Sequence, residues 1–311
     1  MNTSTSKSTP SHAARAVLSD PYLLRRKARM LADAVPQLSP QGALYSAFLR
    51  GNHGRRKAGS GDSFWQFRTY APGDPASAID WRRSARSDGT FVRQYEWEAA
   101  RDVWIICDMG GHMHFSGTAS GPTKAEQAGV LAVALAHLFT RGGERVGLFG
   151  FSERPLAGKY GTDMFAEKIV DAGGGVQSGR IPQDLTQFAP PGPGTYTLWL
   201  SDFLSPIAQL RQRIRAVSRA GTTLHMVQIL DPSEETFPFD GRIQFEGPSR
   251  TDGHLIENAA DIKARYLRRL ARHQDEVSDA AREVGAQLLR HRTNRSLTPT
   301  LIALTAVMEN R

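Results

Sequence analysis

The chain of 311 residues has a single cysteine and no long apolar run, and these two shortages exclude several classes of protein. Cys107 alone cannot form a disulfide within the chain or supply a cluster of zinc-binding thiolates. No apolar segment approaches the roughly 18 residues that a membrane span needs. The first residues also lack the apolar segment of a secretory signal. We therefore expect a cytoplasmic protein without a membrane span.

Familiar catalytic motifs are missing as well. The sequence contains no Gly-x-Ser-x-Gly nucleophile elbow, no phosphate-binding loop ending in Gly-Lys-Ser/Thr and no His-Glu-x-x-His zinc motif. Neither a nucleophile nor a positioned base is evident from the residue pattern. The sequence therefore favours a binding protein over an enzyme and indicates no catalytic residue.

The positive charge of the chain is concentrated near its start. Residues 1–30 hold six basic and one acidic side chain, whereas residues 102–311 hold 23 of each. A basic front end suits nucleic acid, an acidic lipid surface or an acidic protein, and it also improves solubility. Acidic residues are interleaved with the basic ones over residues 50–101, and they count against phosphate binding. Because the first 30 residues remain strongly basic, nucleic-acid binding by the basic N-terminal third is an alternative to protein binding.

Pattern and composition divide the chain into four parts. Residues 1–19 are predicted to be a disordered tail, and residues 20–50 a helical arm with helices over 23–38 and 43–49. A small antiparallel β subdomain is expected over 51–101, with strands at 63–70, 79–85 and 90–97. From residue 102 to 311, strands alternate with helices. This alternation predicts an α/β domain whose mostly parallel sheet carries helices on both faces.

Acidic residues follow three of the predicted parallel strands. Asp108, Asp202 and Asp231 come directly after apolar runs, and Glu234 lies in the loop that follows Asp231. The carboxyl ends of parallel strands meet at one edge, so these carboxylates are expected to share a rim. Such a group suits a bound cation or a basic partner, or it caps helices and loops. A metal-dependent hydrolase that uses Asp108, Asp202 and His112 is a second alternative.

The small β subdomain combines aromatic and charged residues in an unusual density. The candidates are Arg68, Tyr70, Asp74, Asp80, Trp81 and Arg86. Such a mixture can form ion pairs that hold a small subdomain in shape. It can also form a contact surface, because aromatic residues and arginine are the types that anchor protein interfaces. The sequence leaves both roles open.

Several short blocks together are similar to one bacterial family. They are Gly51-Asn52-His53, Gly59-Ser60-Gly61-Asp62-Ser63-Phe64, Arg68-Thr69-Tyr70, Gly73-Asp74, Ile79-Asp80-Trp81-Arg82-Arg83-Ser84-Ala85-Arg86, Asp231-Pro232-Ser233-Glu234-Glu235 and His291-Arg292-Thr293. These blocks resemble the family named domain of unknown function 58. The resemblance implies a von Willebrand factor A-like sheet domain with no established catalytic activity. It also implies association with MoxR-type AAA+ ATPases, as a partner or adaptor.

The resemblance further implies a divalent metal site in a weakened form. Domains of the von Willebrand A type usually hold the metal through an Asp-x-Ser-x-Ser loop, a distant threonine and a distant aspartate. Here the loop reads Asp108-Met109-Gly110-Gly111-His112, and Val176 stands where the threonine is expected. Asp202 matches the second aspartate. The resemblance thus implies a degenerate site of Asp108 and Asp202 that could hold Mg²⁺ weakly. His112 follows Asp108 closely in the sequence and could join such a site.

Together these observations predict a non-enzymatic protein-interaction module. Its expected partner is a MoxR-type AAA+ ATPase or a client protein of that ATPase. The residues expected to contact the partner are Arg68, Tyr70, Asp74, Asp80, Trp81, Arg86, Asp231 and Glu234.

Overall fold

The computed structural model describes residues 17–38, 58–59, 63–86, 89–96, 101–173, 192–218, 221–245 and 253–309. The expected helix over 43–49, Val176 and most of the glycine-rich blocks before residue 63 lie outside these ranges. The chain divides into two compact units. One unit is drawn from residues 1–49 and 101–311, and the other from residues 50–100.

The centre of the larger unit is a five-stranded parallel sheet. Its strand order is β10-β7-β6-β4-β5, with β4 at Asp102–Cys107, β5 at Arg145–Leu148, β6 at Tyr196–Ser201, β7 at Thr223–Leu230 and β10 at Gln287–Arg292. Every neighbouring pair is parallel. One antiparallel bridge, Val146 to Leu156, lies against β5. The pairing of the strands confirms the predicted mostly parallel sheet. The strands are parallel because a helix follows nearly every strand and returns the chain to the same end of the sheet.

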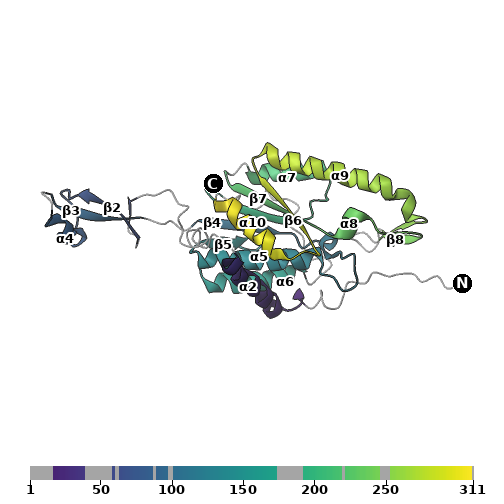
Figure 1. Ribbon diagram of the computed structural model, residues 1–311, viewed down its shortest axis with the longest axis horizontal. Coiled ribbons are helices and arrows are strands. Elements are labelled where there is room, and N and C mark those ends of the chain that lie inside the picture. The colour runs from purple at the N-terminus through teal and green to yellow at the C-terminus, as the bar shows by residue number, and fades with distance from the viewer. Residues whose placement is uncertain are drawn as a thin grey trace. The chain divides into compact units, whose positions relative to one another are not determined.

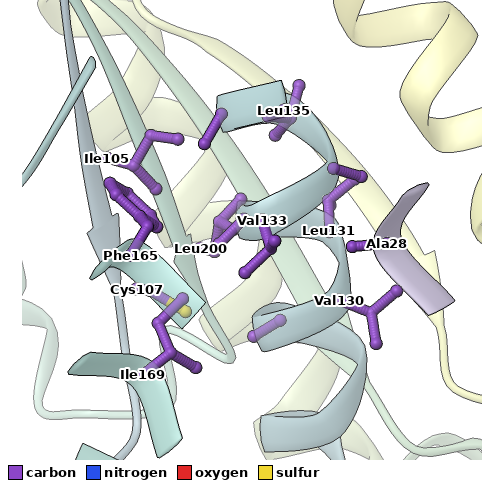
Figure 2. Packing of buried hydrophobic residues seen from close by; sticks show 14 of the residues in the cluster. Ala28, Ile105, Cys107, Val130, Leu131, Val133, Leu135, Phe165, Ile169 and Leu200 are labelled. Carbon is purple, nitrogen blue, oxygen red and sulfur yellow. The ribbon is translucent and has the colours of Figure 1, made fainter. Parts of the chain in front are cut away.

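Helices cover both faces of this sheet (Figure 1). One face carries α2 (Pro21–Leu38), α5 (Lys124–Arg141), α6 (Lys159–Gly173) and α10 (Leu297–Glu309), and the other carries α7 (Ile207–Ser218) and α9 (Ala259–Glu283). Adjacent residues of a strand therefore pack into two separate hydrophobic cores, one on each face of the sheet. Ile105 packs into the first and Ile106 into the second, because successive side chains of a strand point to opposite faces. Figure 2 shows the first core, in which Ile105, Cys107 and Leu200 of the sheet lie beside side chains of α5 and α6.

The helical arm α2 is part of the first core. Leu24, Ala28, Ala32 and Val35 recur at helical spacing and are all buried. Basic residues on the same helix form ion pairs with the domain: Arg25 lies 3.1 Å from Asp163, and Lys27 lies 2.6 Å from Glu126. Two basic residues of the N-terminal region therefore form ion pairs that attach α2 to the rest of the larger unit.

The smaller unit contains a three-stranded antiparallel sheet of order β1-β3-β2, formed by Ala58–Gly59, Phe91–Glu96 and Ser63–Thr69. The strand predicted over residues 79–85 is wrong. Ile79 makes only an isolated bridge to Val92, and residues Trp81–Ser84 form a short helix, α4. The reason is local: the Asp80 carboxylate accepts a hydrogen bond from the backbone of Arg83 at 2.9 Å and so starts a helix. The third strand is β1 instead.

Short elements complete both units. The 3₁₀ helix η1 (Ala76–Ala78) precedes α4 in the smaller unit. In the larger unit, η2 (Gly111–His114) follows β4, and α8 (Pro232–Thr236) follows β7. The strands β8 (Ile243–Phe245) and β9 (His254–Ile256) form an antiparallel hairpin before α9. The elements η2 and α8 both leave the carboxyl edge of the parallel sheet, where the acidic residues lie.

The buried position of α2 predicts unequal effects of two substitutions on one helix. Ala28→Glu places a carboxylate between α2 and the domain, so we expect a loss of several kcal/mol in the free energy of unfolding. Met30→Glu changes an exposed position and should leave stability within about 0.5 kcal/mol of the wild type. Urea denaturation measures both. Equal stability of the two variants would contradict the docking of α2.

Candidate functional site

The acidic residues of the larger unit converge at the carboxyl edge of the sheet. Asp108 follows β4, Asp202 follows β6 and Asp231 follows β7, and these strands are parallel. The strand order also reverses here, since β5 lies on one side of β4 and β6 on the other. In open α/β sheets such a reversal opens the crevice in which ligands bind. The expected common rim is therefore confirmed.

A lysine lies among these acids. Lys124, the first residue of α5, is 1% exposed, and its Nζ lies 2.8 Å from Oδ2 of Asp202 and 2.6 Å from Oε1 of Glu234. The ammonium also faces the ring of Phe115, 5.7 Å from its centroid. Burial acts to lower the pKa of Lys124, but the negative charges of Asp202 and Glu234 outweigh it and raise the pKa above its usual value. Lys124 is therefore a buried cation.

Asp108 is bonded on both of its oxygens. Oδ1 accepts the backbone N–H of Gly110 at 3.0 Å, and Oδ2 accepts the hydroxyl of Ser201 at 2.7 Å. His112 lies 3.1 Å from the same Oδ2 and 3.6 Å from Oδ1 of Asp202. Burial acts to lower the pKa of His112, but the hydrogen bond to Asp108 and the charge of Asp202 raise it overall. His112 is thus a second group at the rim whose protonated, positively charged form is stabilised.

Ser201, His112 and Asp108 have the residue types of a hydrolytic triad but a different geometry. In a triad the serine bonds to the histidine, and the histidine bonds to the acid. Here Ser201 and His112 both approach Oδ2 of Asp108, so the serine hydroxyl donates directly to the carboxylate. This arrangement orients Asp108 and does not activate the Ser201 oxygen.

Asp231 and Glu234 belong to an internal network. The Oδ1 atom of Asp231 accepts the hydroxyl of Ser233 at 2.6 Å and its backbone N–H at 2.9 Å, while Oδ2 accepts the hydroxyl of Thr293 at 2.8 Å. Glu234 accepts the backbone N–H of Asp231 at 2.8 Å, which completes a capping box at the start of α8. Asp231 is 5% exposed, so it offers a partner very little surface.

The donor set does not fit a divalent cation. Mg²⁺ and Ca²⁺ are held by oxygen ligands, typically six or more of them. The oxygens of Asp108 and Asp202 are instead engaged by N–H, O–H and ammonium donors. Across the ranges that the structure describes, no group of three or more His, Cys, Asp or Glu side chains is placed to hold a metal. The ligands implied by the family resemblance therefore lie close together without forming a metal cage.

In the smaller unit, one group of signature residues holds the fold. Arg68 and Asp74 form a bidentate ion pair. Nη1 of Arg68 lies 2.6 Å from Oδ2 of Asp74, and Nη2 donates a second hydrogen bond to Oδ1. The hydrogen bond from Arg68 lowers the pKa of Asp74 to about 2. Asp80 caps α4, and the guanidinium of Arg83 lies over the ring of Phe67 at 4.4 Å. These contacts fix the turn and the short helix.

A second group of signature residues faces solvent. Trp81 on α4 is 66% exposed, and its neighbours Arg82 and Arg86 are exposed too. Tyr70 is also exposed, although its hydroxyl lies 3.4 Å from the backbone oxygen of Asp74. The structure thus divides the predicted contact residues. Arg68, Asp74 and Asp80 shape the unit, whereas Tyr70, Trp81 and Arg86 are open to a partner.

Sequence reasoning missed Lys124 and Ser201. Lys124 lies 78 residues from Asp202 and 110 from Glu234, so no local motif connects them. One signal was present: a lysine directly after the Thr123 cap of an otherwise apolar helix is poorly placed relative to the helix dipole. Ser201 ends β6 beside Asp202 and carries no signal of its own.

Known proteins match this chain over most of its length. Residues 66–276 match the family described as "Protein of unknown function DUF58". Uncharacterized protein Mb1516 of Mycobacterium bovis and Uncharacterized protein Rv1480 of Mycobacterium tuberculosis are each 26% identical to this chain over 269 residues, covering 83% of both partners in each comparison. Among solved structures, the conserved hypothetical protein BatB from Bacteroides thetaiotaomicron gives a TM-score of 0.41 at 14% identity, covering 68% of this chain and 98% of BatB.

None of the helices in the described segments is both long enough and apolar enough to cross a membrane.

His291, near the rim, leads to a prediction about pH. It is buried at the end of β10, its Nδ1 lies 2.9 Å from the hydroxyl of Thr300, and burial lowers its pKa to about 4. Between pH 6.5 and 4 the unfolded chain takes up a proton that the folded chain resists. The free energy of unfolding should therefore fall by up to roughly 3 kcal/mol over this range because of His291.

Urea denaturation at pH 7, 5.5 and 4.5 measures this effect. The variant His291→Gln, which keeps a hydrogen-bonding side chain, should lose stability less steeply than the wild type as the pH falls. The exposed residue His254 supplies the control, and His254→Gln should follow the wild-type curve. Parallel curves for the wild type and His291→Gln would refute the assignment.

Proposed function

Because this chain belongs to the DUF58 family of unknown function, we propose a function from its own surfaces: a non-enzymatic protein-interaction module. The contact surface is the solvent-facing side of α4 together with Tyr70, and the partner is a MoxR-type AAA+ ATPase or a client protein of that ATPase. The proposal places the protein in the cytoplasm and takes its α/β unit to be of the von Willebrand factor A type.

The exposure of Trp81 is the observation that supports this proposal most. A tryptophan that stays 66% exposed leaves much of its apolar ring in water. In protein interfaces, tryptophan, tyrosine and arginine are the residues that most often account for the binding energy. Trp81 and Arg82 lie on α4, Arg86 lies in the turn that follows it, and Tyr70 lies 11 residues before Trp81 in the chain. This combination of residue types is typical of a contact surface.

The rigidity around Trp81 also supports an interface. The Asp80 cap and the ion pair of Arg68 with Asp74 restrict the backbone on which Trp81 and Tyr70 lie. A surface that is held in its bound shape before contact loses less conformational entropy on binding. The contacts of Arg68, Asp74 and Asp80 thus support the exposed residues of the signature.

The charge of the surface indicates the kind of partner. Arg82 follows the tryptophan on α4, and Arg86 lies in the turn after this helix. Their guanidinium groups suit carboxylates, so the partner should present acidic side chains around an apolar pocket for the indole. The identity of the partner as a MoxR-type ATPase comes from the family resemblance of the sequence. It is the first protein to test.

The test is direct binding of the purified full chain to the MoxR-type ATPase of the same host, measured by biolayer interferometry with and without ATP. Trp81→Ala should weaken binding at least tenfold, because a buried interface tryptophan typically contributes about 2 kcal/mol or more. Arg86→Ala should weaken it several-fold. Both variants should keep the wild-type melting temperature, since neither side chain is buried.

Tyr22→Ala is the matched control. Tyr22 is 63% exposed but lies on α2 of the other unit, so its removal should not change the affinity. Wild-type affinity of Trp81→Ala for the ATPase would contradict the proposed surface. If the ATPase does not bind, while DNA or RNA binds with a steep dependence on salt, the nucleic-acid alternative holds instead. Turnover of a substrate by the purified chain would overturn the non-enzymatic role.

A further inference from the structure

The position of Lys124 is unfavourable by local rules. It is the first residue of an 18-residue helix whose cap, Thr123, accepts the backbone N–H of Glu126 at 3.1 Å. The N-terminal end of a helix carries partial positive charge, which favours acidic side chains and disfavours a lysine. Removing the ammonium from water costs several kcal/mol more. A residue that violates two local preferences needs a compensating tertiary contact.

The compensating contacts are the two carboxylates and the ring around the ammonium. Asp202 comes from the end of β6, Glu234 from α8 and Phe115 from the loop that leaves η2. These elements lie between 9 and 110 residues from Lys124 along the chain. Without a cation at this point, the carboxylates of Asp202 and Glu234 would face each other within a buried space. The ammonium therefore joins a helix, a strand end and two connecting segments.

The remaining oxygens of these acids are also engaged. Oδ1 of Asp202 accepts the backbone N–H of Leu204 at 3.1 Å, and Oε2 of Glu234 accepts that of Asp231 at 2.8 Å. Each carboxylate thus presents one oxygen to Lys124 and the other to the backbone. A divalent ion bound to the oxygen that Lys124 occupies would lie only a few ångströms from the ammonium. Two unscreened positive charges at that separation repel strongly in a buried site.

We propose that the side chain of Lys124 is a built-in cation that replaces the divalent metal of a von Willebrand A-type rim. It pairs with Asp202 and Glu234 permanently and reduces their mutual repulsion, so the rim keeps its shape without any free ion. The arrangement of this edge therefore does not depend on Mg²⁺. The proposal rests on the von Willebrand A-type α/β unit of the proposed function but not on the Trp81 surface, which lies in the other unit.

The first experiment measures the melting temperature of the full wild-type chain with a chelator and with about 10 mM Mg²⁺ or Mn²⁺. A site of millimolar affinity would raise the melting temperature by about 3 °C or more. We expect no rise beyond that of a matched concentration of Na⁺ salt. A specific rise with either divalent ion would overturn the proposal.

The second experiment removes the cation. Lys124→Met keeps the length and the apolar stem of the side chain but leaves two buried carboxylates unpaired, and the melting temperature should fall by about 5 to 10 °C. Lys168→Met, on the exposed face of α6, is the control and should melt as the wild type does. An unchanged melting temperature of Lys124→Met would show that the ammonium is not needed.

The third variant tests the charge itself. Lys124→Met combined with Asp202→Asn and Glu234→Gln removes the negative charges but keeps oxygens that can accept the N–H groups of Leu204 and Asp231. This triple variant should recover at least half of the melting temperature lost by Lys124→Met. A triple variant that is no more stable than the single one would refute the role of Lys124 as a counter-ion. If neither variant folds, the metal titration of the wild type decides the proposal.

Discussion

The buried ion pairs of Lys124 with Asp202 and Glu234 are the constraint on which the carboxyl edge of the sheet depends. Three parallel strands deliver acidic residues to the same edge, and their mutual repulsion must be compensated. Lys124 compensates two of them from the start of α5, while Ser201 and His112 engage Asp108. Hydroxyl and backbone donors satisfy Asp231. Each acid at this edge thus has its own internal partner.

The two units use their charged residues differently. At the rim, the acids bond to donors inside the larger unit, which leaves few of their oxygens for a partner. In the smaller unit, the ion pair of Arg68 with Asp74 and the cap of Asp80 hold the backbone, while Trp81 and Arg86 remain in solvent. Protein binding is therefore easier to reconcile with the smaller unit than with the rim. This contrast is why the proposed contact surface consists of Tyr70, Trp81 and Arg86 and excludes Asp231 and Glu234.

Particular residues show how far sequence reasoning reached. The apolar runs ending at Cys107, Leu200 and Leu230 predict strands, and the acids after them lie on one rim as expected. The segment 79–85 was predicted as a strand from its composition, but the cap formed by Asp80 turned it into a helix. Arg68, Asp74 and Trp81 stood together in one signature, and composition could not distinguish a structural ion pair from an exposed ring. Burial alone separated them.

The sequence by itself determined the alternation of strands and helices, the parallel sheet and the common edge for its acidic residues. These follow from periodicity and from the position of each residue relative to a strand end, which are local properties of the chain. Only the tertiary structure decided what the acids contact. Lys124 meets Glu234 across 110 residues and Ser201 meets Asp108 across 93. Such contacts depend on how helices pack against the sheet. No short sequence motif can predict a contact between residues that lie so far apart in the chain.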